Sequence, residues 1–81
     1  MNVSIKTFAS VRDALGYDER TVSVRDGSSV AELLREVLGG APGLMERAES
    51  LLVAVNEEYA AGDRIVREND VVAIFPMVSG G

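Results

Sequence analysis

The chain has 81 residues, of which 47% are hydrophobic, and a net charge of −5. This length allows one domain with a single small core. The negative charge and the scattered basic residues argue against nucleic acid as a partner and favour a partner with a basic surface. Cysteine and histidine are absent, which excludes disulfides and thiol chemistry and leaves no side chain with an ordinary pKa near neutrality for acid–base catalysis.

The sequence contains neither a recognisable signal peptide nor an apolar run of transmembrane length. We therefore expect a cytoplasmic protein with no membrane partner.

Polarity alternates along residues 2–8, which predicts a half-buried first strand with Phe8 on its polar face. A short helical turn is expected at residues 9–15, closed by Gly16, and a second strand at residues 20–25 with Val22 and Val24 facing inward.

The clearest predicted element is a helix that begins after Ser29. Serine is a favoured N-cap, and Glu32 three residues later completes a capping box. Apolar residues recur at helical spacing from Val30 to Leu38, and the glycine pair at 39–40 is expected to cap the end. The pattern predicts an amphipathic helix that packs one face against a sheet.

The second half of the sequence predicts a weaker helix followed by strands. Residues 43–50 carry a partial helical pattern, and residues 51–55 form a nearly continuous apolar run that is typical of a buried central strand. Residues 56–69 are expected to be mostly loop, with a short strand near 58–60 and turns at 62–63 and 69–70. The last strand is predicted at residues 71–75.

This order of elements predicts an α+β fold of the β-grasp, or ubiquitin-like, type. It consists of a mixed sheet of about five strands with one main helix packed across one face. We assign residues 1–76 to the β-grasp domain and predict that residues 77–81 form a flexible C-terminal diglycine tail. With the first and last strands as central neighbours, the tail leaves from the middle of the sheet.

Side-chain parity in the strands predicts an exposed apolar surface. Val72 and Ile74 are the expected core-facing pair of the last strand, so Phe75 points to the opposite side, next to Phe8 of the first strand. Tyr59 extends this surface from the loop. Exposed apolar surfaces rimmed by polar residues usually mark partner contacts. The alternative is that a strand end bends and buries its ring.

The sequence ends in Gly80 and Gly81, after a hydrophobic strand and a short segment. Glycine has no side chain, so a diglycine end with a free carboxylate is thin enough to enter another protein's active site. In an extended conformation residues 77–81 reach at most about 16–18 Å. We interpret Gly81 as the reactive group; a frayed, inert terminus is the alternative.

Three segments together resemble the small subunit of molybdopterin synthase, a family of ubiquitin-like sulfur carriers. They are Phe-Ala-Ser-Val-Arg at 8–12, Ala-Val-Asn at 54–56, and Asn-Asp-Val-Val-Ala-Ile-Phe-Pro-Met-Val-Ser-Gly-Gly at 69–81. The similarity covers the whole chain, and the last segment is the most specific. The family usually has two consecutive prolines before the terminal motif. Here Met77 follows Pro76, which loosens the root of the tail.

The resemblance implies that a ubiquitin-activator-like enzyme adenylates the Gly81 carboxylate, using ATP and magnesium that it binds itself. A sulfur donor protein then supplies the sulfur of a C-terminal thiocarboxylate. The large synthase subunit uses this sulfur to convert cyclic pyranopterin monophosphate to molybdopterin, in a heterotetramer with two copies of each subunit. The chain is therefore expected to be no enzyme on its own and to bind no cofactor or metal.

The site residues expected from this comparison are the reactive end and a partner-binding surface. Gly81 and Gly80 form the reactive end. The partner-binding residues are Phe8, Arg12, Tyr59, Phe75, Pro76, Met77, Val78 and Ser79. Arg64 is a further candidate for an ion pair with a partner. The carboxylates at positions 57, 58, 63, 68 and 70 are interpreted as solvated surface rather than a catalytic pair.

Three other functions remain open at this point. A sulfur carrier for thiamine or for tRNA thiolation would use the same chemistry at Gly81. A ubiquitin-like protein modifier would instead join Gly81 to an amine of a target; Lys6 is the only lysine, which argues against chain building but not against single attachment. A plain interaction module would have an inert terminus.

Overall fold

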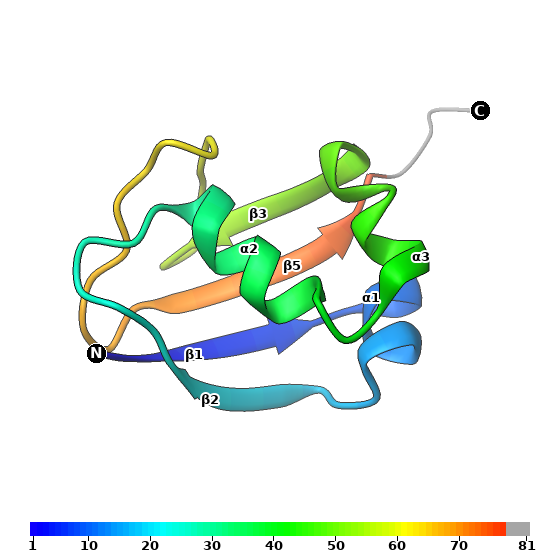
Figure 1. Ribbon diagram of the computed structural model, residues 1–81, viewed down its shortest axis with the longest axis horizontal. Coiled ribbons are helices and arrows are strands. Elements are labelled where there is room, and N and C mark those ends of the chain that lie inside the picture. Colours follow the sequence, from blue (N-terminus) through cyan, green and yellow to red (C-terminus); the bar gives the residue numbers. More distant parts are fainter. Residues whose placement is uncertain (78–81) are drawn as a thin grey trace.

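The computed structural model describes residues 1–77. Its elements are β1 (Asn2–Thr7), α1 (Ala9–Leu15), β2 (Glu19–Ser23), α2 (Val30–Leu38), α3 (Pro42–Met45), a 3-10 turn (Ala48–Ser50), β3 (Leu51–Val55), β4 (Glu58–Tyr59) and β5 (Val71–Pro76) (Figure 1). The predicted roles of Val78, Ser79, Gly80 and Gly81 lie outside the described residues.

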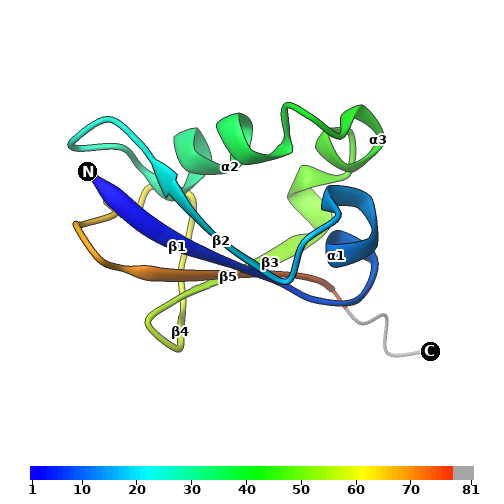
Figure 2. The same cartoon turned by 90° about the horizontal axis from the view of Figure 1, so that it is seen from below.

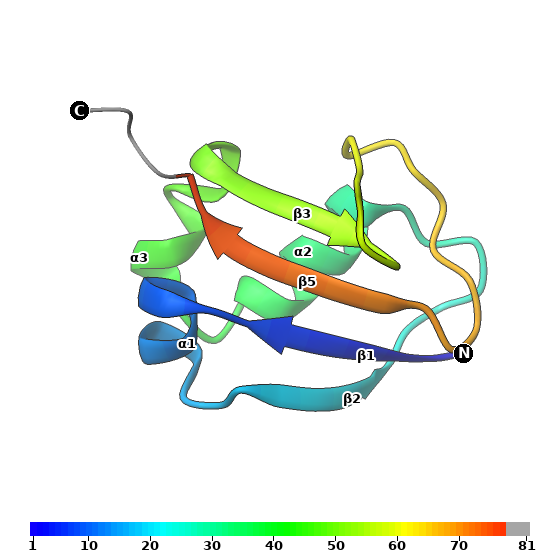
Figure 3. The same cartoon turned by 180° about the vertical axis from the view of Figure 1, so that it is seen from behind.

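The five strands form one mixed sheet in the order β2-β1-β5-β3-β4. The first and last strands are the central neighbours and run parallel, with Ile5 in register with Val72. The other pairs are antiparallel. Figure 3 shows β1 and β5 side by side in the middle of the sheet. This arrangement confirms the predicted α+β, β-grasp class.

The helices lie on one face of the sheet and leave the other face open (Figure 2). Alternate strand residues point toward the helices and form the core together with the apolar side of α2. Ile5 and Ile74 of the strands and Leu33 and Leu38 of α2 all have 0% exposure. Thr7 completes the inward set of β1 and is buried as well. The inward parity predicted for β1 and β5 is therefore confirmed. None of the helices in residues 1–77 has the length and apolar character that crossing a membrane requires.

The N-terminus of α2 has the predicted capping box. The Ser29 hydroxyl oxygen accepts from the Glu32 backbone N–H at 3.2 Å, and the Ser29 backbone N–H donates to Glu32 Oε1 at 3.1 Å. These bonds satisfy two amides that the first helical turn leaves without partners. The helix ends before Gly39 as predicted, but Gly39 has a right-handed conformation with φ −57°. Gly16, the C-cap of α1, has the left-handed conformation instead, with φ 83°.

Several predicted elements differ in extent from those observed. β1 ends at Thr7 rather than at residue 8, and β5 extends to Pro76 rather than to residue 75. β2 covers Glu19–Ser23 rather than residues 20–25, although Val24 is buried as expected. The weak helix predicted at residues 43–50 divides into α3 and the 3-10 turn. This division follows from physical chemistry, because a short segment that contains Gly43 has little intrinsic helix stability.

A hydrogen-bonded cluster joins the β3–β4 hairpin to the start of β5. Asn56 and Glu57 form a two-residue turn with φ values of 51° and 71°, the backbone combination of a type I′ hairpin. The Asn56 side chain accepts from the Val71 amide and donates to Asp70 Oδ1, both at 2.9 Å. Asp70 Oδ2 also accepts from the Arg67 amide at 2.8 Å. The cluster holds β4 against the rest of the sheet.

Candidate functional site

Phe8 lies where β1 passes into α1. It is the N-cap residue of α1 and has an extended backbone, with φ −139° and ψ 150°. Because this conformation continues the alternation of β1, the buried Thr7 is followed by an outward-pointing Phe8, which is 46% exposed. Local backbone geometry thus places the ring on the face of the sheet that the helices leave open.

Phe75 lies at the centre of a group of three rings that we call the aromatic patch, made of Phe8, Tyr59 and Phe75. The Phe8 and Phe75 rings meet edge to face, with centroids 6.1 Å apart and an interplanar angle of 82°. The Tyr59 and Phe75 centroids are 5.9 Å apart at 56°. Such arrangements are favourable for aromatic quadrupoles. Three of the four aromatic residues of the chain therefore gather on one surface.

The aromatic patch depends on strands that are distant in the sequence. Parallel pairing of β1 with β5 brings Phe8 near Phe75. On the other side, Ala73 of β5 pairs with Ala54 of β3, which in turn pairs with Tyr59 of β4. Two small alanines thus separate the tyrosine from the first strand. The sequence-based expectation that these three rings lie together is confirmed, and their role in partner binding stays a prediction.

Pro76 and Met77 lie beside the aromatic patch at the end of the central strand. Pro76 is still in register with Leu51 of β3, and the Met77 backbone N–H donates to the Ser50 carbonyl at 3.2 Å. Hydrogen bonding to the sheet therefore extends to the first residue of the predicted tail. The Met77 side chain is 55% exposed, so the surface next to Phe75 continues to the last described residue.

The two arginines singled out from the sequence lie in different places. Arg12 of α1 forms ion pairs with Asp18 at 3.5 Å and with Asp13 at 4.0 Å, and its side chain is half exposed. Pairs this exposed contribute little to stability, and the partner contact expected of Arg12 stays a prediction. Arg64 lies instead by the N-terminus of α2, where its carbonyl accepts from the Val30 amide.

Two of the loop carboxylates have a structural role that sequence reasoning missed. Asp70 belongs to the cluster around Asn56, and Glu68 accepts from the Asn2 backbone amide at 3.0 and 3.2 Å. The Asn-Asp pair before the last strand was the available signal, because both residue types bond to nearby backbone in turns. Within residues 1–77, no three Asp or Glu side chains converge as a metal site would require.

Among residues 1–77, two side chains have shifted pKa values, and neither belongs to the aromatic patch. Burial raises the pKa of Tyr17, and the Arg20 guanidinium, 4.2 Å from the ring centroid, partly opposes this shift. Hydrogen bonds from the Ser29 backbone and side chain lower the pKa of the Glu32 carboxyl, with a smaller contribution from Arg25. Tyr17 lies before β2 and Glu32 lies in the capping box of α2, so the two shifts arise from local packing and from helix capping.

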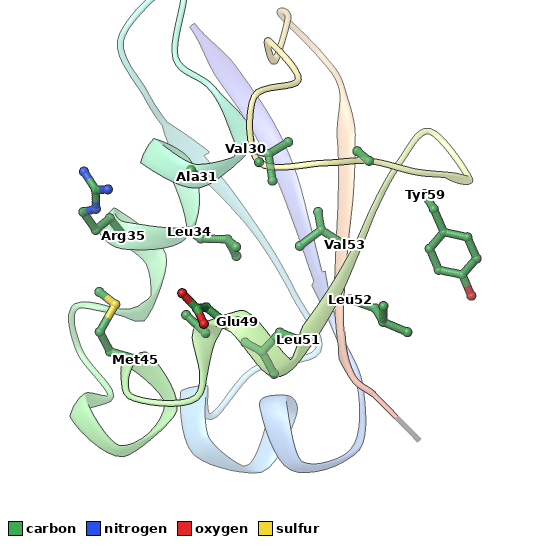
Figure 4. A pocket seen from close by; sticks show the side chains of 13 residues that line it. Val30, Ala31, Leu34, Arg35, Met45, Glu49, Leu51, Leu52, Val53 and Tyr59 are labelled. Atoms are coloured by element: carbon green, nitrogen blue, oxygen red, sulfur yellow. The ribbon is translucent and has the colours of Figure 1, made fainter. Parts of the chain in front are cut away.

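A groove of about 540 Å³ opens between α2 and β3, next to the aromatic patch (Figure 4). Its walls are mainly apolar and include Leu34, Met45 and Val53, and it shares Tyr59 with the patch. Glu49 is the only carboxylate among the described residues that line the groove, so the lining offers no paired acid and base of the kind that catalysis needs. Within residues 1–77, the groove and the open sheet face therefore adjoin at Tyr59.

A β-grasp sheet with an open aromatic face beside its central C-terminal strand places this chain among the ubiquitin-like proteins. Residues 5–81 match the model of the ThiS family. The chain belongs to this family.

Individual relatives agree with the family match. The molybdopterin synthase sulfur carrier subunit of Arabidopsis thaliana is 32% identical over 81 residues, which cover 100% of this chain and 84% of the relative. Among solved structures, SAMP1 from Haloferax volcanii, a small archaeal modifier protein, superimposes with a TM-score of 0.85 at 28% identity and covers 100% of both chains. A putative molybdopterin converting factor subunit 1 from Pyrococcus furiosus gives the same score and identity over 96% of this chain and 99% of its own. The resemblance to sulfur carrier subunits is thus confirmed.

Proposed function

We propose that this chain is the sulfur carrier subunit of a molybdopterin synthase and that Gly81 carries the sulfur as a thiocarboxylate. The observation that carries this proposal is the aromatic patch beside the end of the central strand β5, at the root of the diglycine segment. The name of the Arabidopsis relative, a molybdopterin synthase sulfur carrier subunit, supports the choice of pathway.

The proposed chemistry begins with activation of the Gly81 carboxylate. A carboxylate is a poor electrophile, so its oxygen must first become part of a leaving group. A ubiquitin-activator-like enzyme supplies this step by forming an acyl adenylate from ATP, with the nucleotide and magnesium bound by the enzyme. Sulfur that a donor protein delivers at the sulfide level then attacks the acyl carbon, the C–O bond to AMP breaks, AMP leaves, and the thiocarboxylate remains. Because this chain has no cysteine, no thiol of its own can intercept the activated group.

The sulfur is then transferred inside a complex with a second, larger subunit. The aromatic patch docks on that subunit and directs residues 77–81 into its active site, where cyclic pyranopterin monophosphate accepts the sulfur. The word subunit in the names of the relatives supports such an assembly, which we propose to be a heterotetramer with two copies of each chain. On this proposal the chain acts in the cytoplasm and is no enzyme on its own, because the catalytic groups belong to its partners.

The decisive experiment is intact-mass measurement after incubation with the activating enzyme, ATP and a sulfur donor. We expect the mass to rise by about 16 Da, the difference between sulfur and oxygen. A variant that lacks Gly81 is the matched control and should keep its mass. An unchanged mass of the full chain, with an activating enzyme shown to work on another carrier, would contradict the proposal.

A second experiment identifies the acceptor. The thiocarboxylate form is mixed with the large synthase subunit and cyclic pyranopterin monophosphate, and molybdopterin is assayed. We expect product only when all three are present. Sulfur transfer to a thiamine precursor or to tRNA instead would leave the carrier chemistry at Gly81 intact and replace the proposed pathway.

Protein modification is the second candidate function, and the similarity to the small archaeal modifier protein SAMP1 favours it. In that case the activated Gly81 would be attacked by a lysine amine of a target. Isolation of the chain from cells under denaturing conditions distinguishes the two functions. A pure sulfur carrier yields only the free chain, whereas a modifier yields covalent conjugates that disappear when Gly81 is deleted.

A further inference from the structure

We propose that the partner covering the open sheet face places a carboxylate opposite Lys6. The inference rests on the proposed function, since it concerns the surface that docks on the large synthase subunit. Its basis is the position of Lys6 on this face and the charge that covering the face would remove from water.

Lys6 lies in a row of outward-facing residues that crosses all the strands. Strand register places Glu19 of β2 and Ala73 of β5 on either side of Lys6, and Ala54 and Tyr59 continue the row across β3 and β4. Residues paired across strands share a face. The row therefore runs from a charged half on β2 and β1 to an apolar half that ends at the aromatic patch.

The position of Lys6 brings it under any partner that covers the aromatic patch. It lies two residues before Phe8 on the same face of the strand, and its other neighbour, Ala73, lies two residues before Phe75. Ala73 has a small side chain, so the aliphatic stem of Lys6 has room to lie toward β5. A surface that contacts Phe8 and Phe75 thus also approaches the ammonium group.

The ammonium group has no strong partner within the described chain. No carboxylate of residues 1–77 lies within 4.0 Å of it, not even that of the cross-strand neighbour Glu19. Lys6 is exposed to water in the free protein. Covering an unpaired charge is costly unless the covering surface supplies an opposite charge and hydrogen bonds. A carboxylate on the partner meets this requirement. It also fixes how the two surfaces are aligned in an otherwise apolar contact.

The experiment measures the affinity of the intact chain for the large synthase subunit. Lys6→Met removes the charge and keeps most of the stem, and Lys6→Glu reverses the charge. We expect Lys6→Met to raise Kd about tenfold and Lys6→Glu to raise it further, mainly through faster dissociation. Arg35→Glu, on exposed helix surface, changes the net charge as Lys6→Glu does and should leave Kd within about twofold.

Glu19→Gln tests whether Lys6 acts only through its neighbour. With a partner carboxylate opposite Lys6, removing the Glu19 charge leaves Kd unchanged or lowers it, because a competing anion is lost. The inference is overturned if Glu19→Gln weakens binding as much as Lys6→Met does, if Arg35→Glu matches Lys6→Glu, or if Lys6→Met has no effect.

Phe75→Asp in the same assay separates this inference from the proposed function. Weaker binding by Phe75→Asp together with unchanged binding by the Lys6 variants would remove the carboxylate and keep the docking face. Unchanged binding by all of these variants would remove the docking face as well. Circular dichroism and thermal unfolding of each variant confirm that the fold is retained.

Discussion

The two faces of the sheet are built from alternate residues of the same strands, yet they differ in what covers them. In β5, Val72 and Ile74 are fully buried under the helices, while Phe75, the residue after Ile74, points to the other face and is partly exposed. The helices of the same chain thus cover the inner face. The outer face exposes aromatic rings that a partner can bury. Stability and binding can thus be assigned to neighbouring residues of one strand.

The largest expected effect comes from breaking the inner face. Ile74→Ala removes buried atoms under α2 and leaves a cavity, so we expect a loss of about 2–5 kcal/mol in the free energy of unfolding. This is a large share of the roughly 5–15 kcal/mol typical of a small domain. Chemical denaturation monitored by circular dichroism measures it. Val71→Ala, at the partly exposed start of the same strand, is the matched control and should cost less than about 1 kcal/mol.

Phe75→Asp breaks the outer face and should show the opposite balance. The ring contacts Phe8 and Tyr59 at the surface, and a central aromatic in an interface can contribute about 2 kcal/mol or more to binding. We expect affinity for the large synthase subunit to fall about 30-fold or more, with a smaller change in stability than Ile74→Ala produces. Titration calorimetry measures the affinity. Severe unfolding with no specific loss of binding would show that the ring belongs to the core.

The helix that covers the inner face depends on its N-cap. Ser29→Ala removes the side-chain acceptor for the Glu32 amide, and we expect it to cost about 1 kcal/mol. Thermal unfolding should detect this loss. Ser29→Asp keeps an acceptor at the same position and should restore most of the stability. An equal loss in both variants would mean that the cap bond does not stabilise α2.

The smallest expected effect is the dependence of this cap on pH. The Glu32 carboxyl has a pKa below its ordinary value because Ser29 donates to the charged form. Its charge therefore adds stability at pH values above the unfolded pKa, and this contribution is lost as the pH falls through the folded pKa. Glu32→Gln keeps a capping-box oxygen without the charge. The wild type should be the more stable of the two near neutral pH, and the gap should close on acidification; a gap independent of pH would contradict this.

Most secondary structure could be predicted because its causes are local. The Ser29–Glu32 cap and the apolar spacing after it identify α2 without any distant contact. Alternation in β1 and β5 correctly predicts which side chains point inward. The glycine pair at 39–40 correctly predicts where α2 ends, since Gly39 is the C-cap of this helix. The structure brings the predicted Phe8, Tyr59 and Phe75 together, but their role as a site still awaits the binding experiments.

Other features follow only from contacts between distant segments. Nothing in the sequence near Asn56 specifies that its side chain bonds Asp70 and the Val71 amide. The groove between α2 and β3 likewise exists only once the helix lies across the sheet. Local patterns carry no information about such distances, since they depend on how the chain closes its loops.

By itself the sequence determined the element types, the inward and outward sides of the strands and the family resemblance, because these follow from residue spacing and motif. Only the tertiary structure decided that Phe8, Phe75 and Tyr59 meet ring to ring, that Lys6 lies in the same row as Ala73, and that Asp70 is structural. The physical reason is that strand pairing joins residues far apart in the sequence. Register then decides which side chains share a face and which lie within reach of a partner.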